Sequence, residues 1–316
     1  MYFFPRRRSL AVLLTVLAFS GLIVFHHVLD DFPDAIVVAL SNDKFQLHRM
    51  PEGGNLTNIE PKLNGKPIKD LRLLCWILCD PKDLDKRVVH VKNTWGQRCD
   101  TMLYMSSKEN KTFPTVGLDV LPGRNHIASK SKAAWTYIYE NYLDKADFFV
   151  KADPDTYIIV ENMKRFLQEK NTSKPEFYGH MMLHPTNITY ASGGPGIILT
   201  RESVRRLVTQ AFKLKKNCMP DGQFEDLKTG RCLSLVGGKA VNTKDDQGRE
   251  RSYIFQIINH IQGKWPQWYI QYKNNKTVGA GLDKCCSEYP MSFHYVTSMN
   301  LYMLEYLFYK SHVTKD

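Results

Sequence analysis

The sequence predicts an α/β domain in which a central sheet is covered by helices on both faces. From residue 71 onward, apolar runs of strand length alternate with segments of helical spacing, and this alternation is typical of such sheets. The chain has 316 residues, of which 43% are hydrophobic and 24% are charged. This composition predicts a globular protein with an ample core and excludes an intrinsically disordered or collagen-like chain.

The first element is an apolar run that predicts a single N-terminal transmembrane helix over residues 9–29. Arg6, Arg7 and Arg8 precede this run and no acidic residue occurs before Asp30. The positive-inside rule therefore places residues 1–8 in the cytosol and the rest of the chain in the lumen. A cleaved signal peptide is the alternative, because residues 18–20 resemble a small-residue cleavage site. The length of the run favours the anchor.

Residues 30–70 contain several prolines and glycines and show little periodicity. Such a segment predicts a stem or linker between the membrane and a folded domain. The remaining residues, 71–316, are then expected to form one lumenal domain.

Individual elements of this domain can be predicted in order as far as residue 237. Strands are expected at 71–78, 101–105, 147–152, 176–180 and 196–200. Helices are expected at about 82–95, 125–142, 158–169 and 202–212. Beyond residue 237 the pattern is too weak to predict single elements.

Cysteines and glycosylation sequons agree with a lumenal location. In an oxidising compartment six of the 7 cysteines are expected to form three disulfides, for which about 15 pairings exist. A zinc site is the alternative, but Cys75 and Cys79 lack a second Cys/His pair nearby. Asn-x-Ser/Thr sequons begin at Asn55, Asn110, Asn171, Asn187 and Asn275.

Two carboxylates follow the apolar strand 147–152. Asp153 and Asp155 are two residues apart, at the carboxyl edge where α/β sheets bind ligands. Paired hard oxygen ligands suit Mn²⁺ or Mg²⁺, which in turn can hold a diphosphate. The spacing alone is not specific, because Asp83 and Asp85 share it in a different context. Turn and helix-cap acids are the alternative.

The segment from Lys151 to Tyr157 resembles the D-x-D segment of the β1,3-glycosyltransferase family that includes the core 1 galactosyltransferases. Other stretches on both sides of this segment are also similar to the family and occur in the family's order. They lie at 74–76, 90–99, 104–110, 191–196, 225–232, 285–287 and 292–296. The resemblance implies a GT-A-like nucleotide-sugar transferase domain with a mixed central sheet. It also implies metal-dependent, inverting transfer of galactose from UDP-galactose to GalNAc on Ser/Thr of glycoproteins, by a type II membrane protein of the Golgi.

The same resemblance implies a metal site. Asp153 and Asp155 would bind Mn²⁺, with Mg²⁺ as the alternative ion, and His294 would complete the coordination. A histidine in an aromatic setting such as this is also typical of a satisfied core residue, so the packing role stays open at this point.

Catalysis and substrate contact are implied for further residues. Asp226, with Glu225 beside it, falls where the family places its catalytic base, although acids at a helix start also stabilise the helix dipole. Gly193 and Gly194 would let backbone approach the donor closely, and a plain tight turn explains them equally well. The aromatic set that could offer a flat face to a sugar, or simply pack in the core, is Trp265, Trp268 and Tyr269.

Two departures from the family pattern stand out. The family commonly has three consecutive acids at the D-x-D segment, and here the middle position is Pro154. Proline restricts its own φ and biases Asp153 toward an extended conformation, which could leave the metal site intact or tilt it. Cys79 is outside the shared cysteine set, so it is expected to be the unpaired thiol.

Two other functions remain open: a fringe-like β1,3-N-acetylglucosaminyltransferase, and a non-catalytic, chaperone-like relative. The retained acids argue against the second. The expected partners are UDP-galactose, a GalNAc-bearing glycoprotein and the membrane, with a homodimer as a possible assembly. The formal charge of +11 therefore does not indicate a nucleic-acid partner, since a basic lumenal surface can steer an anionic donor or an acidic glycoprotein.

Overall fold

The computed structural model describes residues 70–273 and 279–311. The predicted cytosolic tail, the transmembrane helix over 9–29 and all but the last residue of the stem lie outside the described residues. Within the described residues, no helix combines the length and the apolar character needed to cross a membrane.

A seven-stranded mixed sheet forms the centre of the described domain, in the order β10-β6-β9-β4-β1-β2-β3. Strand β9 runs antiparallel to both of its neighbours, and all the other neighbouring pairs are parallel. In sheet order the strands are Lys239–Asn242, Glu176–Gly179, Ile197–Thr200, Phe148–Ala152, Leu73–Cys79, Thr101–Ser106 and Thr115–Gly117. The mixed central sheet expected of a GT-A-like domain is therefore present.

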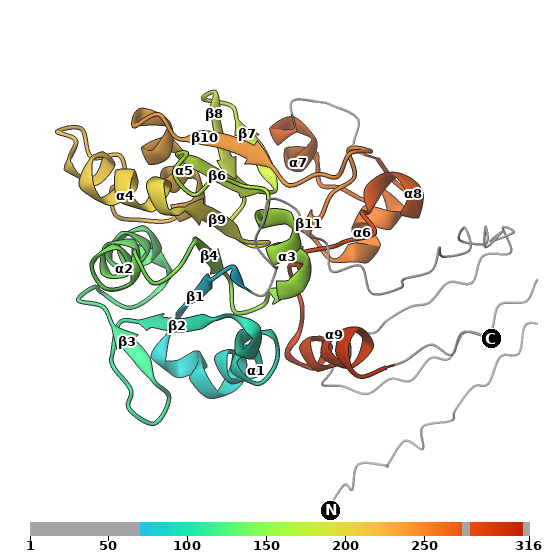
Figure 1. Ribbon diagram of the computed structural model, residues 1–316, viewed down its shortest axis with the longest axis horizontal. Coiled ribbons are helices and arrows are strands. Elements are labelled where there is room, and N and C mark those ends of the chain that lie inside the picture. Colours follow the sequence, from blue (N-terminus) through green and yellow to red (C-terminus); the bar gives the residue numbers. More distant parts are fainter. Residues whose placement is uncertain (1–69, 274–278, 312–316) are drawn as a thin grey trace, which may run out of the picture. The chain divides into compact units, whose positions relative to one another are not determined.

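Helices cover both faces of this sheet, as predicted (Figure 1). One face carries α2 (Ile127–Tyr142), α4 (Arg201–Thr209) and α5 (Glu225–Leu235). The other carries α1 (Val89–Asn93), α3 (Val160–Leu167) and α9 (Ser298–Tyr309). Strand β1 is apolar on both faces, so each face needs a cover of helices. Successive side chains of a strand point to opposite faces, and Trp76 packs in the apolar core under the first set of helices while Ile77 packs in the core under the second.

Smaller elements join the C-terminal part of the chain to the strand that ends before Asp153. A three-stranded sheet has the order β11-β12-β5, with strands Ser252–Tyr253, Ser292–Phe293 and Tyr157–Ile158. Strands β7 (Met181–His184) and β8 (Ile188–Ala191) form an antiparallel pair. The remaining helices are α6 (Ile257–Gln262), α7 (Gln267–Tyr272) and α8 (Leu282–Cys285). None of these elements was predicted.

The helix expected over 82–95 is present in an irregular form. A 3₁₀ turn at Pro81–Asp83, a π-helical segment at Leu84–Val88 and α1 (Val89–Asn93) follow one another directly, and the helix ends at Thr94, before a separate 3₁₀ turn at Trp95–Arg98. Trp95 gives the physical reason, because it is fully buried and its indole N–H donates to the carbonyl oxygen of Thr156 at 2.7 Å. Burial of this side chain takes precedence over continuation of the helix.

The three expected disulfides are present, and they join Cys75 to Cys99, Cys218 to Cys232 and Cys285 to Cys286. Cys79 is the one unpaired cysteine in the described part of the chain, as expected, and it is buried. Two of the bridges attach loops to regular elements, since Cys75 lies in β1 and Cys232 in α5.

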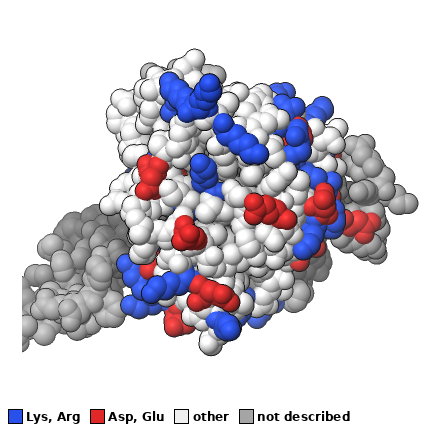
Figure 2. Space-filling view, turned by 90° about the vertical axis from the view of Figure 1, so that its left-hand side faces the viewer, with Lys and Arg blue, Asp and Glu red and all other residues white. Residues whose placement is uncertain are grey.

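Basic side chains do not gather into one surface on the face shown in Figure 2. Lys and Arg are interspersed there with Asp and Glu. This face therefore carries no continuous basic track.

Candidate active site

Strand β4 delivers Asp153 and Asp155 to the carboxyl edge of the main sheet. The strand ends at Ala152, and a turn follows in which the N–H of Thr156 donates to the carbonyl oxygen of Asp153 at 3.1 Å. Pro154 takes the second position of this turn, where proline is favoured. The two carboxylates remain about one-third exposed, at 32% and 34%, so both can reach a ligand.

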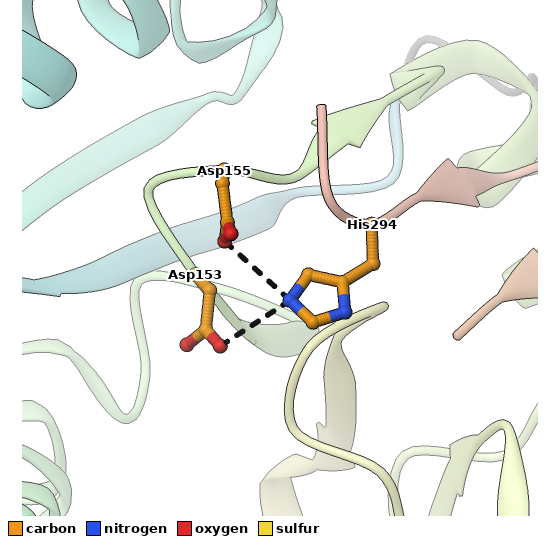
Figure 3. Close-up of side chains that lie close together, drawn as sticks. All are labelled: Asp153, Asp155 and His294. Atoms are coloured by element: carbon orange, nitrogen blue, oxygen red, sulfur yellow. Dashed lines mark ion pairs between the residues drawn. The ribbon is translucent and has the colours of Figure 1, made fainter. Parts of the chain in front are cut away.

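His294 arrives at the same place from the C-terminal part of the chain. Strand β12 pairs antiparallel with β5 and sets Phe293 opposite Tyr157, which brings the next residue, His294, beside the turn. Its Nε2 atom lies 3.4 Å from Asp155 Oδ1 and 3.8 Å from Asp153 Oδ2 (Figure 3).

The tautomer of His294 follows from its other ring nitrogen. Nδ1 donates to the carbonyl oxygen of Ile254 at 3.0 Å, so Nε2 is the ring nitrogen that faces the two carboxylates. A backbone carbonyl that holds one nitrogen in this way is the usual support of a metal-binding histidine.

The donor set fits a divalent cation. One ligand atom from each of Asp153, Asp155 and His294 lies within 4.8 Å of the others, and carboxylate with imidazole suits Mn²⁺ or Mg²⁺. Burial alone would lower the pKa of His294, but the hydrogen bond and charge of Asp155 outweigh it and raise this pKa. Burial likewise favours a higher pKa for Asp155, and the His294 contact reverses this and lowers it.

Gly193 and Gly194 lie where backbone passes directly beside the site. A Cβ atom on Gly194 would overlap the ring of His294, and one on Gly193 would lie 2.9 Å from Glu225 Oε1. The carbonyl oxygen of Gly194 also accepts from Thr156 Oγ1 at 2.6 Å. Close approach, which only glycine allows, therefore explains both positions better than a plain turn does.

Asp226, in the first turn of α5, faces an open pocket of about 390 Å³. Its Oδ2 accepts from the N–H of Gly193 at 3.0 Å and its Oδ1 from the N–H of Leu227 at 2.8 Å. Ile254 lines the same pocket, so this pocket adjoins the residue that orients His294. The carboxylate is thus held in one orientation beside the cluster of Asp153, Asp155 and His294.

Glu225 occupies a different environment from its neighbour. It is 4% exposed, and its Oε1 lies 2.7 Å from the Nζ atom of Lys151. Lys151 is fully buried and also binds Asp153 Oδ1 at 2.6 Å. Glu225 therefore faces the interior in this structure and pairs with Lys151, whereas Asp226 faces the pocket. A catalytic role for Glu225 stays a prediction.

The charges of buried Lys151 and Glu225 and of the partly exposed Asp153 stabilise one another. Burial raises the pKa of Glu225, and the Lys151 ammonium opposes this increase. Burial would lower the pKa of Lys151, but the carboxylates of Asp153 and Glu225 raise it well above its usual range. Sequence reasoning did not assign a role to Lys151, although a lysine inside the apolar strand β4 was the signal that could have found it.

The three aromatic candidates separate into one pocket residue and two supporting ones. Trp268 is 45% exposed and lines the pocket with Asp226. Tyr269 is fully buried and its hydroxyl is 2.9 Å from His180 Nε2, so it cannot offer its face to a sugar. Trp265 stacks on Tyr269, with ring centroids 5.9 Å apart. Of the three, the structure places Trp268 at the pocket, and its contact with a sugar stays a prediction.

Comparison with known proteins decides the family. The model of the Fringe-like family matches residues 82–245 of this chain, a range that includes Asp153, Asp155 and Asp226. The chain belongs to the Fringe-like family.

Curated relatives of this Fringe-like chain carry the names of glycosyltransferases. Glycoprotein-N-acetylgalactosamine 3-beta-galactosyltransferase 1 of Xenopus laevis is 34% identical over 245 residues, which cover 76% of this chain and 67% of the relative. Human chondroitin sulfate synthase 3 is 28% identical over 181 residues, 51% of this chain and 20% of that protein. Mouse beta-1,3-glucosyltransferase is 26% identical over 178 residues, 55% of this chain and 36% of that protein.

Solved structures resemble the Fringe-like chain only weakly. The catalytic domain of Drosophila beta-1,4-galactosyltransferase 7, in complex with xylobiose, has a TM-score of 0.33 and 15% identity, and the match covers 68% of this chain and 84% of that one. This similarity is too low to bear on function.

Proposed function

We propose that this chain is a glycosyltransferase that transfers galactose from UDP-galactose in β1,3 linkage to GalNAc-α-Ser/Thr of glycoproteins, by metal-dependent inverting displacement. One observation carries the proposal: Asp226 is held in an open pocket that adjoins the cluster of Asp153, Asp155 and His294. The 34% identity to the Xenopus galactosyltransferase, over most of the described domain, supports the choice of donor and acceptor.

The cluster of Asp153, Asp155 and His294 would hold Mn²⁺, with Mg²⁺ as the alternative ion. A divalent cation at this position supplies positive charge to the donor diphosphate and to the leaving UDP. The chain's own residues set the geometry, since Ile254 orients His294 and Lys151 holds one oxygen of Asp153.

Asp226 is the proposed catalytic base. An acceptor hydroxyl is a poor nucleophile near neutral pH, so a carboxylate within hydrogen-bond reach takes its proton as the new bond forms. The backbone N–H groups of Gly193 and Leu227 orient this carboxylate, which retains further lone pairs for the substrate. A single displacement with one base inverts the anomeric carbon, and an α-linked donor then gives a β-linked product.

We also propose a Golgi membrane location, with residues 9–29 as the anchor of a type II protein. The arginines before this segment and the disulfides of the described domain support it. A GalNAc-bearing glycoprotein of the same lumen is the proposed acceptor.

The donor is tested with a panel of UDP-sugars, because the relatives' names include galactosyl and glucosyl transfer. The purified full-length chain is incubated with Mn²⁺, a GalNAc-peptide and each UDP-sugar, and transfer is measured by mass spectrometry. We expect galactose transfer. Transfer of N-acetylglucosamine instead would indicate a fringe-like enzyme, and no transfer from any donor would indicate a non-catalytic relative.

The role of Asp226 is tested by Asp226→Asn. The amide keeps the shape of the side chain but cannot accept the proton, so transfer should fall by about 10²–10⁴-fold while UDP binding stays near that of the parent. Because the amide accepts only one of the two backbone N–H groups that Asp226 binds, the unfolding temperature should fall slightly. Asp246→Asn is the matched control, because Asp246 is an exposed aspartate elsewhere on the domain. Near-normal transfer by Asp226→Asn would contradict the assignment.

A further inference from the structure

Phe224 is an exposed aromatic residue at the rim of the pocket that holds Asp226. It directly precedes α5 and lines the pocket together with Trp268. Its exposed fraction is 69%, the largest of the hydrophobic residues that line this pocket. Neither its position nor its exposure is explained by packing within the described domain.

The backbone of Phe224 is in an unfavourable conformation. Three non-glycine residues in the described part of the chain have positive φ, namely Asn187, Phe224 and Tyr295. Asparagine tolerates this region, whereas bulky side chains do so at a cost. Phe224 has φ 58° and ψ 50°, and because its ring is mostly exposed, burial in the domain does not offset that cost. Backbone strain of this kind is found at ligand-binding sites.

The pocket is large enough for the sugar ring of the acceptor but not for its peptide. About 390 Å³ is at the lower end of the range for ligand pockets, roughly 300–1,000 Å³, and it can take a sugar ring but not the peptide to which the ring is attached. If a sugar hydroxyl reaches Asp226, the peptide must leave through the mouth of the pocket. Phe224 lies at that mouth, where its ring is free to contact the peptide.

We propose that Phe224 contacts the polypeptide that carries the acceptor sugar, and thereby selects peptide-linked GalNAc over the sugar alone. This inference rests on the proposed function. The ring offers a rigid apolar surface that loses little entropy on binding. An apolar side chain or a proline next to the glycosylated Ser/Thr is the chemistry that fits it.

The experiment measures binding of two ligands by calorimetry, with the full-length chain in the presence of Mn²⁺ and UDP. One ligand is a GalNAc-α-Thr peptide with proline next to the threonine, and the other is methyl α-GalNAc. The variant is Phe224→Asn, since asparagine tolerates positive φ and so should keep the fold. Phe224→Tyr retains the ring, and Leu235→Asn, at the exposed far end of α5, is the matched control.

We expect Phe224→Asn to weaken binding of the peptide about 10-fold, equivalent to about 1.4 kcal/mol, and to change binding of the methyl glycoside less than about 2-fold. Phe224→Tyr and Leu235→Asn should bind both ligands as the parent does. An equal loss for both ligands, unchanged peptide binding, or a loss of UDP affinity would each overturn the inference, as would a parent chain that binds neither ligand. A parent that binds the peptide but transfers no sugar would refute the proposed function and leave this inference intact.

Discussion

Lys151 shows at the scale of one residue how the site is held together. It lies inside β4, among fully buried apolar neighbours, and its ammonium contacts Asp153 and Glu225. A buried charge of this kind is tolerated only where partners compensate its lost hydration. Lys151 therefore joins the carboxylate that ends β4 to the helix that carries Asp226.

Lys151→Met should destabilise the domain by about 3–5 kcal/mol, because it leaves Glu225 as a buried carboxylate without its cation. Urea unfolding of the full-length chain measures the effect. The double variant Lys151→Met/Glu225→Gln removes both charges and should recover at least half of the loss. Lys215→Met, at an exposed lysine, is the control and should change little. A loss below about 1 kcal/mol in the single variant would show that the ion pair does not support the fold.

Single residues differ in how far the sequence predicts them. Asp153 and Asp155 follow a recognisable apolar strand, so local pattern predicts their place at the sheet edge. His294 is 139 residues beyond Asp155 in the numbering, and only the family resemblance connects the two. Phe224 carries no local signal, because a left-handed conformation of an aromatic residue is set by the surrounding fold.

At the scale of elements, two-residue strands decide the geometry of the site. Strands β5 and β12 pair through residues such as Tyr157 and Phe293, and this pairing carries His294 to the turn after β4. Strands of this length have no periodicity that a sequence pattern could detect. Long elements such as α2 and β1 were predictable for the opposite reason, since their apolar spacing repeats over several residues.

Glu305 is a buried acid that links helix α9 to the rest of the domain. It binds Arg98 through both guanidinium NH groups, with one contact at 2.9 Å, and accepts from the hydroxyl of Tyr157 at 2.9 Å. Only Leu301 and Glu305 of this helix are buried. Because Tyr157 belongs to β5, the same contact links α9 to the strand next to the turn that carries Asp153 and Asp155.

Glu305→Ala should lower the free energy of unfolding by about 3–5 kcal/mol, since Arg98 and the Tyr157 hydroxyl lose their buried partner. Hydrogen exchange of the α9 amides should accelerate at the same time, as the helix loses these buried hydrogen bonds. Tyr306→Ala, at the next position and 57% exposed, is the matched control. Equal exchange rates in the Glu305 variant and the parent would contradict this account of α9.

At the scale of the whole molecule, the covered α/β sheet was predictable and the C-terminal third was not. The sheet follows from the alternation of strand and helix patterns before residue 237. The later part contributes His294, Ile254 and Trp268. Apart from β10 and α9, its strands β11 and β12 have two residues each, and its helices α6, α7 and α8 have six, six and four. The long-range contacts of these pieces specify their positions, and such contacts leave no local pattern in the chain.

Two buried histidines make the free energy of unfolding of the whole domain depend on pH, because the folded chain opposes their protonation. His180 and His260 are fully buried, and burial lowers their pKa values to about 3 and about 4. His260 also accepts from the N–H of Phe255 through Nε2, at 3.3 Å, so this nitrogen must stay unprotonated in the fold.

The direction in which stability changes with pH follows from the number of protons that the folded and unfolded chains bind. Between the unfolded pKa of about 6.5 and these lower folded values, the unfolded chain binds more protons than the folded one, so stability falls as pH is lowered through that window. For His260 the loss between pH 7 and pH 5 should be about 2 kcal/mol, measured by urea unfolding at each pH. His260→Gln keeps an acceptor for Phe255 but does not titrate, so its stability should fall less over the same range. A variant that loses as much stability as the parent between pH 7 and pH 5 would rule out His260 as a source of the acid sensitivity.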